Sequence, residues 1–143
     1  MTIRKKKILF LCTGNSCRSQ MAEGFAKALR GDEFEVYSAG IETHGLNPNA
    51  VKIMAEAGID ITSQQSQNIS ELLDLDIDVV YTVCGHAHET CPVFPGSAEI
   101  IHIPFPDPPA LAAELEKQGK SKDKQLEPYR RVRDMIKDFI LSI

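Results

Sequence analysis

Residues 7–19, KILFLCTGNSCRS, decide the fold of this chain. The part up to Cys12 is a short continuous apolar run, which is typical of a strand buried in a parallel sheet. Residues 13–16 have the composition of a turn. A helical pattern begins at about Arg18, with apolar residues recurring at intervals of three and four, and Gly31 favours its end. The stretch therefore predicts a strand, a tight loop and a helix in direct succession.

The remaining chain repeats this alternation of strand and helix patterns. Apolar runs predict further strands, while prolines, turn residues and helical periodicity predict further helices. The expected strands are residues 34–39, 77–83 and 98–103, and the expected helices are residues 47–57, 70–73, 110–117 and from about 129 to the C-terminus. Such alternation predicts a single α/β domain over residues 1–143, with a four-stranded parallel sheet flanked by helices and covered on both faces.

The last expected helix carries an apolar face. Its members are Val132, Met135, Ile136, Phe139, Ile140 and Ile143. Docking to a membrane surface is one use of such a face, but packing on the sheet is far more common, and we expect packing. No apolar run reaches the length of a membrane span, and the N-terminal apolar stretch is too short for a signal-peptide core. We therefore expect a cytoplasmic protein.

The composition is that of an ordinary globular domain, with 43% hydrophobic and 25% charged residues. The formal net charge is −4 and no basic stripe is available to neutralise phosphates, which argues against nucleic acid as the partner. The size and the acidity suit a monomer. The chain has four cysteines, Cys12, Cys17, Cys84 and Cys91. They point to chemistry or metal binding, because cytoplasmic thiols are kept reduced.

Three segments of interest fall at the ends of predicted strands. Cys12 ends the first strand, Cys84 follows the third, and residues 104–107 follow the fourth. Ligands of parallel α/β sheets bind beyond the carboxyl ends of the strands. The sequence therefore predicts one shared site at this edge of the sheet.

The segment from Cys12 to Ser19 has the features of an oxyanion-binding loop. The backbone N–H groups of such a loop and the N-terminus of the following helix favour a bound anion. Gly14 allows backbone conformations that other residues resist, and Arg18 offers a planar fork that matches a tetrahedral oxyanion. The same field favours the thiolate of Cys12, to which Ser19 is placed to donate a hydrogen bond. The alternative is a buried cysteine and an exposed arginine at this spacing by chance.

A zinc site is an alternative use of the later cysteines. The four candidate ligands are Cys84, His86, His88 and Cys91. Their spacing is not that of a CxxC motif, and residues two apart on a helix do not share a face. Solvent-facing histidines are the simpler interpretation. Packing or surface roles are expected for His44, His102, Tyr37 and Tyr81.

Several segments of the chain resemble one known family. They are CTGNSCRSQMAEG at 12–24, YSAGIETHGLNP at 37–48, the pair Cys84 and Cys91 with Pro92, the stretch from Phe105 to Pro108, and RVRDMI at 131–136. With these motifs the chain resembles the thioredoxin-coupled arsenate reductases, which share the fold of the low-molecular-weight protein tyrosine phosphatases. The likeness runs over nearly the whole chain, and it implies that fold.

The resemblance implies a role for the residues of the loop. In that family the first cysteine is the nucleophile and the loop binds the oxyanion, so Cys12 and Arg18 take those roles with arsenate as the substrate. The oxyanion-binding residues would be Thr13, Gly14, Asn15, Ser16, Cys17, Arg18 and Ser19. Nothing requires Cys17 itself to react, and we expect Cys17→Ala to retain activity.

The resemblance also implies a cation site. Some members of the family bind potassium beside the loop, and Asn15, Glu23 and Ser38 match such ligands. Gln67, however, stands where a carboxylate would be expected. Apart from this monovalent cation no cofactor is implied, and thioredoxin would be the electron donor.

Phosphatases and reductases share the attack of a thiolate on a tetrahedral oxyanion and differ in the next step. A phosphatase hydrolyses a phospho-cysteine with water, whereas a reductase passes the sulfur to a second thiol. The resemblance implies a Cys12–arsenate adduct, a Cys12–Cys84 disulfide with release of arsenite, and then a Cys84–Cys91 disulfide that thioredoxin reduces. A phosphatase, by main or residual activity, and a non-enzymatic metal or redox sensor are the alternatives. The matching phosphatases carry tyrosines after the loop aspartate, where this chain has prolines.

The spacing of the last two cysteines predicts a conformational change. Cys84 and Cys91 lie seven residues apart, and two turns of a helix would separate them by about 10 Å along its axis. A disulfide tolerates only about 7 Å between α-carbons. We therefore expect residues 84–91 to unwind or loop outward on oxidation, which would expose the disulfide to thioredoxin.

Asp107 has two candidate roles. It is placed to cap an expected helix from Ala110 to Lys117. The resemblance places the family's loop aspartate at the same position, where it would donate a proton to the leaving oxygen. The two roles are compatible.

Overall fold

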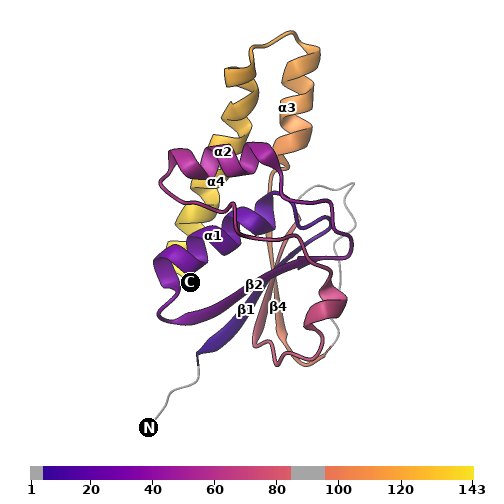
Figure 1. Ribbon diagram of the computed structural model, residues 1–143, viewed down its shortest axis with the longest axis vertical. Helices are drawn as coiled ribbons and strands as arrows, with labels where there is room; N and C mark the ends of the chain where they lie inside the picture. The colour runs from indigo at the N-terminus through magenta and orange to yellow at the C-terminus, as the bar shows by residue number, and fades with distance from the viewer. Residues whose placement is uncertain (1–4, 85–95) are drawn as a thin grey trace.

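The computed structural model describes residues 5–84 and 96–143, in which strands alternate with helices (Figure 1). The strands are β1 (Lys6–Cys12), β2 (Phe34–Gly40), β3 (Val79–Cys84) and β4 (Glu99–Phe105). The helices are α1 (Arg18–Arg30), α2 (Pro48–Glu56), α3 (Pro108–Lys117) and α4 (Lys122–Ser142), and a short 3-10 helix, η1 (Ile69–Leu72), precedes β3. None of the helices in these two ranges has the length and apolarity to cross a membrane.

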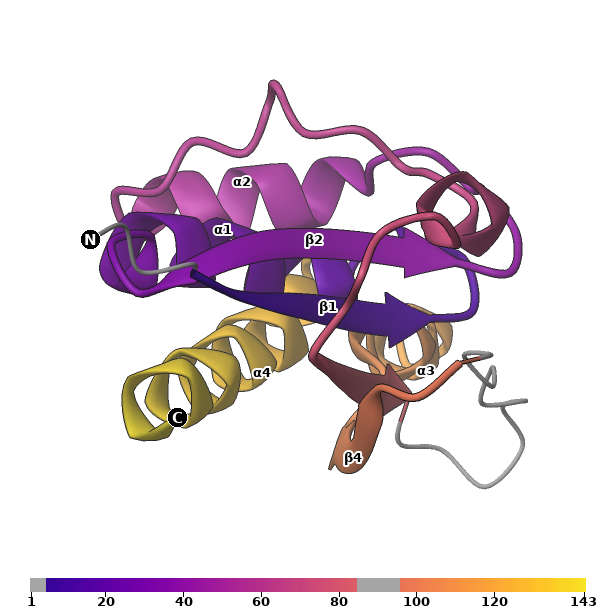
Figure 2. The same ribbon diagram turned by 90° about the horizontal axis from the view of Figure 1, so that it is seen from below.

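The four strands form one parallel sheet in the order β2-β1-β3-β4, which confirms the predicted fold class. Cys12 is paired with Gly40 on one side, and its neighbour Leu11 is paired with Thr82 on the other. Figure 2 shows the arrowheads of β1 and β2 at the same end of the molecule, beside η1. The carboxyl ends of the strands therefore meet at one edge, as the sequence predicts.

The two faces of the sheet are covered differently. On one face, Ile8 and Phe10 belong to a core cluster with buried residues of α1, α2 and α4. On the other face, Leu9 and Leu11 pack with Leu72 of η1 and with Ile77. Both faces are covered, as predicted, but among the described residues the second cover is a 3-10 helix and its flanking segment instead of an α-helix.

Helix α4 begins at Lys122, about seven residues before the predicted start. The Oγ of Ser121 caps it by accepting a hydrogen bond from the backbone N–H of Lys124 (3.3 Å). The prediction was wrong because Pro128, which removes a backbone donor and normally ends a helix, is accommodated inside this one. The predicted apolar face is buried at positions 132, 136 and 140, whereas Met135 is 40% exposed.

The predicted loop over residues 104–109 is shorter in the structure. Strand β4 continues through Phe105, and α3 begins at Pro108 instead of Ala110. Pro108 takes the first helical position, where its missing N–H costs nothing. Asp107 therefore lies on a two-residue connection held at both ends, directly beside the carboxyl edge of the sheet.

Candidate active site

The loop after β1 is held in shape by the side chain of Asn15. This residue adopts a left-handed conformation with φ of 48° and is fully buried. Its Oδ1 accepts a hydrogen bond from the backbone N–H of Gln67 (2.8 Å), so its Nδ2 faces Ser19 and donates to the Oγ there (2.9 Å). The strained backbone turn is thus fixed from two sides by buried hydrogen bonds.

Gly14 is required for a reason other than the predicted one. Its backbone is not left-handed. A Cβ on Gly14 would lie 2.3 Å from Nδ1 of His44, so the glycine makes room for the imidazole that lies against the loop. The backbone N–H of His44 also donates to the carbonyl of Gly14 (3.0 Å). A side chain at position 14 would therefore have to displace the imidazole of His44, whereas the backbone conformation here is open to other residues.

The Cys12 thiol lies at the start of this loop and is 5% exposed. Its Sγ is 3.1 Å from the Oγ of Ser19. The Oγ of Ser19 also accepts a hydrogen bond from Nδ2 of Asn15 (2.9 Å), and its hydroxyl hydrogen is available to the sulfur. Ser19 therefore links the sulfur of Cys12 to the buried side chain of Asn15.

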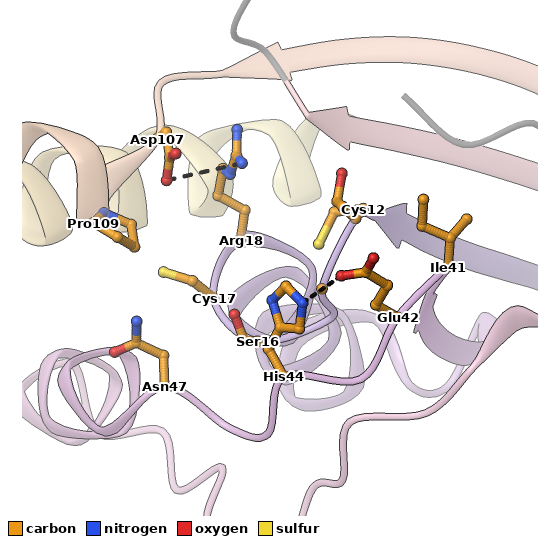
Figure 3. A pocket seen from close by; sticks show the side chains of 12 residues that line it. Cys12, Ser16, Cys17, Arg18, Ile41, Glu42, His44, Asn47, Asp107 and Pro109 are labelled. Atoms are coloured by element: carbon orange, nitrogen blue, oxygen red, sulfur yellow. Dashed lines mark hydrogen bonds and ion pairs between the residues drawn. The ribbon is translucent and has the colours of Figure 1, made fainter. Parts of the chain in front are cut away.

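The guanidinium of Arg18 links the loop to the end of β4. It is 7% exposed, and its Nη1 donates to the carbonyl of Phe105 (3.0 Å). Its Nη2 lies 3.9 Å from Oδ1 of Asp107 (Figure 3). The side chain of Asp107 makes no capping hydrogen bond to α3, although Asp107 occupies the N-cap position. Its carboxylate instead faces Arg18 across the site.

These groups surround a cavity of about 630 Å³. Its lining comprises Cys12, Thr13, Gly14, Ser16, Cys17, Arg18, Ile41, Glu42, His44, Asn47, Asp107 and Pro109. Of the predicted oxyanion-binding residues, Asn15 and Ser19 lie outside this lining and act by holding the loop. The cavity is the size of a small-ligand site.

One wall of the cavity was not predicted. It is formed by the segment after β2, where Nε2 of His44 lies 2.6 Å from Oε2 of Glu42 (Figure 3). Asn47 closes the wall, and its Oδ1 also caps α2 by accepting from the N–H groups of Asn49 (2.8 Å) and Ala50 (3.2 Å). The sequence could have predicted this wall, because β2 is a parallel strand that ends at the same edge as β1, and the segment that follows it must lie beside the loop.

Cys17 lies in the loop but is a poor nucleophile. It is buried, and burial, which outweighs the opposing effect of Arg18, raises the pKa of its thiol well above the ordinary range. A thiol in this condition stays protonated near neutral pH. Its side chain therefore lines the cavity as a neutral group (Figure 3).

Cys84 ends β3 and is buried. It is disulfide-bonded in this structure, whereas Cys12 and Cys17 are free thiols. Three of the predictions fall on residues that the structure does not describe. They are the role of Cys91, the zinc ligands His86 and His88, and the refolding of residues 85–91. Within the described residues, no cluster of three or more histidine, cysteine or acidic side chains could hold a metal ion.

Three comparisons bear on the identity of the chain. The family model described as low molecular weight phosphotyrosine protein phosphatase matches residues 7–140. An arsenate reductase of Halalkalibacterium halodurans is 52% identical over 134 residues, which cover 94% of this chain and 91% of the relative. Two solved structures of an arsenate reductase, one in the phosphate binding state and one in the oxidized state, have TM-scores of 0.75 and 0.73 and identities of 37% and 36%. Each covers 96% of this chain and 95% of its own.

The four-stranded parallel sheet, with a cysteine-headed loop between β1 and α1 that lines the cavity, defines a phosphatase-like α/β domain. The chain belongs to the low molecular weight phosphotyrosine protein phosphatase family. The relative and the solved structures to which the chain is similar are named arsenate reductases.

Proposed function

We propose that this protein, an arsenate reductase, passes oxidation along three thiols and is returned to its reduced state by thioredoxin. The observation that carries the proposal is the position of Cys12. This residue lines the cavity, its sulfur is hydrogen-bonded to Ser19, and its strand β1 is paired with β3, which ends in Cys84. Relatives named arsenate reductases support the choice of substrate.

The first step joins sulfur to arsenic. The thiolate of Cys12 attacks arsenic(V), an As–S bond forms, and one arsenate hydroxyl leaves as water after Asp107 has donated a proton to it. The Arg18 guanidinium and the loop N–H groups stabilise the charge on the remaining oxygens. The facing positions of Arg18 and Asp107 across the cavity support these roles.

The second step reduces arsenic. The thiolate of Cys84 attacks the sulfur of Cys12, an S–S bond forms, and the S–As bond breaks with its electron pair left on arsenic, which departs as arsenite. Cys91 then attacks the sulfur of Cys84, so that a Cys84–Cys91 disulfide forms and Cys12 is released as a thiolate. The dithiol of thioredoxin reduces that disulfide by exchange. Such a cycle needs a reducing compartment, and we propose the cytoplasm, with the chain acting as a monomer.

A coupled assay with arsenate, thioredoxin, thioredoxin reductase and NADPH tests the proposal. A parallel assay with a chromogenic aryl phosphate reports the chemistry of the loop alone. We expect Cys12→Ser to abolish both activities, and Cys84→Ser to abolish arsenate turnover while residual hydrolysis of the ester remains. We expect Cys91→Ser to stop after one turnover with a Cys12–Cys84 disulfide that is detectable by mass spectrometry.

Two outcomes would overturn the thiol cascade. One is continued arsenate turnover by Cys84→Ser, because no second thiol would then be needed. The other is the absence of any Cys12–Cys84 linkage in Cys91→Ser after a single turnover. Turnover that proceeds with a different dithiol but not with thioredoxin would overturn only the choice of reductant.

A further inference from the structure

The candidate cation ligands are close together, and each of their oxygens already accepts a hydrogen bond from the chain. Oε1 of Glu23 accepts a hydrogen bond from Oγ of Ser38, and Oδ1 of Asn15 accepts one from the N–H of Gln67 (2.8 Å). The carbonyl of Ser38 accepts from Nε2 of Gln67 (2.9 Å). A cation at this position would compete with these donors of the chain, and Gln67 supplies an N–H donor where a carboxylate ligand would be expected.

A positive charge of the protein is already present at this position. Nζ of Lys27 lies 2.5 Å from Oε2 of Glu23, one helical turn away on α1. The side chain of Glu23 is only 8% exposed, whereas that of Lys27 is 52% exposed. A nearly buried carboxylate needs a partner charge, and the ammonium reaches it from the surface.

The same hydrogen bonds continue from Glu23 to the reactive sulfur. Glu23 accepts a hydrogen bond from the hydroxyl of Ser38, and the carbonyl of Ser38 accepts one from the side-chain amide of Gln67. The backbone N–H of Gln67 donates to the side chain of Asn15. Asn15 in turn donates to Ser19, which contacts the sulfur of Cys12. Asn15, Ser19 and Ser38 are fully buried, so water does not compete for these bonds.

We propose that Lys27 is this protein's replacement for a monovalent cation. It is a positioning residue: its ammonium neutralises Glu23, and thereby keeps Asn15 and Ser19 oriented toward Cys12 without any bound metal. The proposal concerns the oxyanion loop alone and does not depend on the proposed thiol cascade.

The test compares salts and variants by two measurements. The first is the rate at which iodoacetamide alkylates Cys12, followed by mass spectrometry of its peptide across a range of pH. The second is the melting temperature. Both are measured in KCl and in tetramethylammonium chloride at about 0.1 M each, so that screening is the same. Lys27→Met removes the charge and Lys27→Arg retains it. Lys137→Met removes an exposed lysine of α4 as the matched control.

We expect the wild type, Lys27→Arg and Lys137→Met to behave alike in the two salts. Lys27→Met should alkylate roughly tenfold more slowly at neutral pH in tetramethylammonium chloride, as expected when a group that orients a reactive residue is lost. KCl should restore its rate and raise its melting temperature, because an ion that binds only the folded state stabilises it. The double variant Glu23→Gln/Lys27→Met lacks the carboxylate that needs a positive partner, so its alkylation rate and its melting temperature should not differ between the two salts.

A wild type that needs KCl for its normal rate would overturn the proposal. So would a Lys27→Met variant that is unchanged in both salts, or one that is slowed without recovery in KCl. If Lys27→Met fails to fold in both salts while the double variant folds, the unbalanced Glu23 carboxylate is the cause, which supports the proposal. If both fail to fold, the proposal is wrong.

Discussion

Cys12 and Cys84 end adjacent parallel strands of the sheet, so the two cysteines lie close together at its carboxyl edge. Leu11 pairs with Thr82, which places Cys12 opposite Val83 and leaves Cys84 one residue further along. Strand spacing and rise then put the two α-carbons about 6 Å apart, within the range of a disulfide. The pairing of β3 with β4 shifts its register between Thr82 and Cys84, so the end of β3 is an irregular part of this edge.

Cys84 is disulfide-bonded in this structure and Cys12 is a free thiol, so the Cys12–Cys84 disulfide of the proposed mechanism requires Cys84 to change its partner, and we expect the irregular end of β3 to move with it. We expect the amides of the last two residues of β3 to lose protection from hydrogen exchange when this disulfide is trapped in Cys91→Ser, while those at residues 79–81 stay protected. Exchange measured by mass spectrometry before and after one arsenate turnover tests this. Unchanged exchange at the end of β3 would mean that the sulfurs meet without such a movement.

Arg18→Lys should weaken oxyanion binding. The planar guanidinium, which donates a hydrogen bond to the carbonyl of Phe105 and faces Asp107, would be replaced by a single ammonium group. Loss of a charge-assisted hydrogen bond costs about 1.5–3 kcal/mol, so we expect roughly 10- to 100-fold weaker protection of Cys12 from alkylation by phosphate or arsenate. Arg131→Lys, at an exposed position of α4, is the control and should bind normally. Unchanged protection in Arg18→Lys would mean that the backbone alone binds the anion.

Asp107→Asn separates the two roles considered for this residue. Its side chain makes no capping bond to α3, so we expect the free energy of unfolding to change by no more than about 0.5 kcal/mol. Arsenate turnover should fall by roughly 100-fold, because an amide does not donate a proton to the leaving oxygen. Urea denaturation and the coupled assay on the same preparation measure both. Lost stability with unchanged turnover would make Asp107 a structural residue.

Gly14→Ala should be costly only while His44 is present. The added methyl group would overlap the imidazole, whose side chain is 55% exposed and has to shift, so we expect a cost near the lower end of the roughly 1–3 kcal/mol typical of overpacking. In a His44→Ala background we expect a clearly smaller cost, which a double-mutant cycle of unfolding free energies measures. Equal costs in both backgrounds would mean that Gly14 is needed for its backbone conformation after all.

Cys17 should make stability depend on alkaline pH. Burial raises its folded pKa above the unfolded value of about 8.5, so the folded state holds a proton that the unfolded state loses. The contribution of this thiol to the free energy of unfolding is therefore complete below about pH 8.5 and declines as the pH rises above that value. We expect Cys17→Ala to retain turnover and to flatten the fall in melting temperature between about pH 8.5 and 10, below the range where tyrosines titrate. An unchanged slope would mean that Cys17 ionises normally in the fold.

The sequence alone was sufficient for the features that depend on neighbouring residues. The strand, loop and helix around Cys12 were predicted correctly because apolar runs, turn residues and helical periodicity act over a few positions. The parallel sheet followed from the alternation of these elements. The start of α4 was missed because the same local rules interpret Pro128 as a break, and only its packing in the helix overrides them.

Tertiary structure decided which distant residues meet. It put His44 and Glu42 in the wall of the cavity, brought Glu23 to Ser38, and placed the ends of the strands that carry Cys12 and Cys84 side by side. A sequence specifies local conformation through short-range sterics and hydrogen bonding, whereas these contacts depend on strand order, register and side-chain packing between segments far apart in the chain.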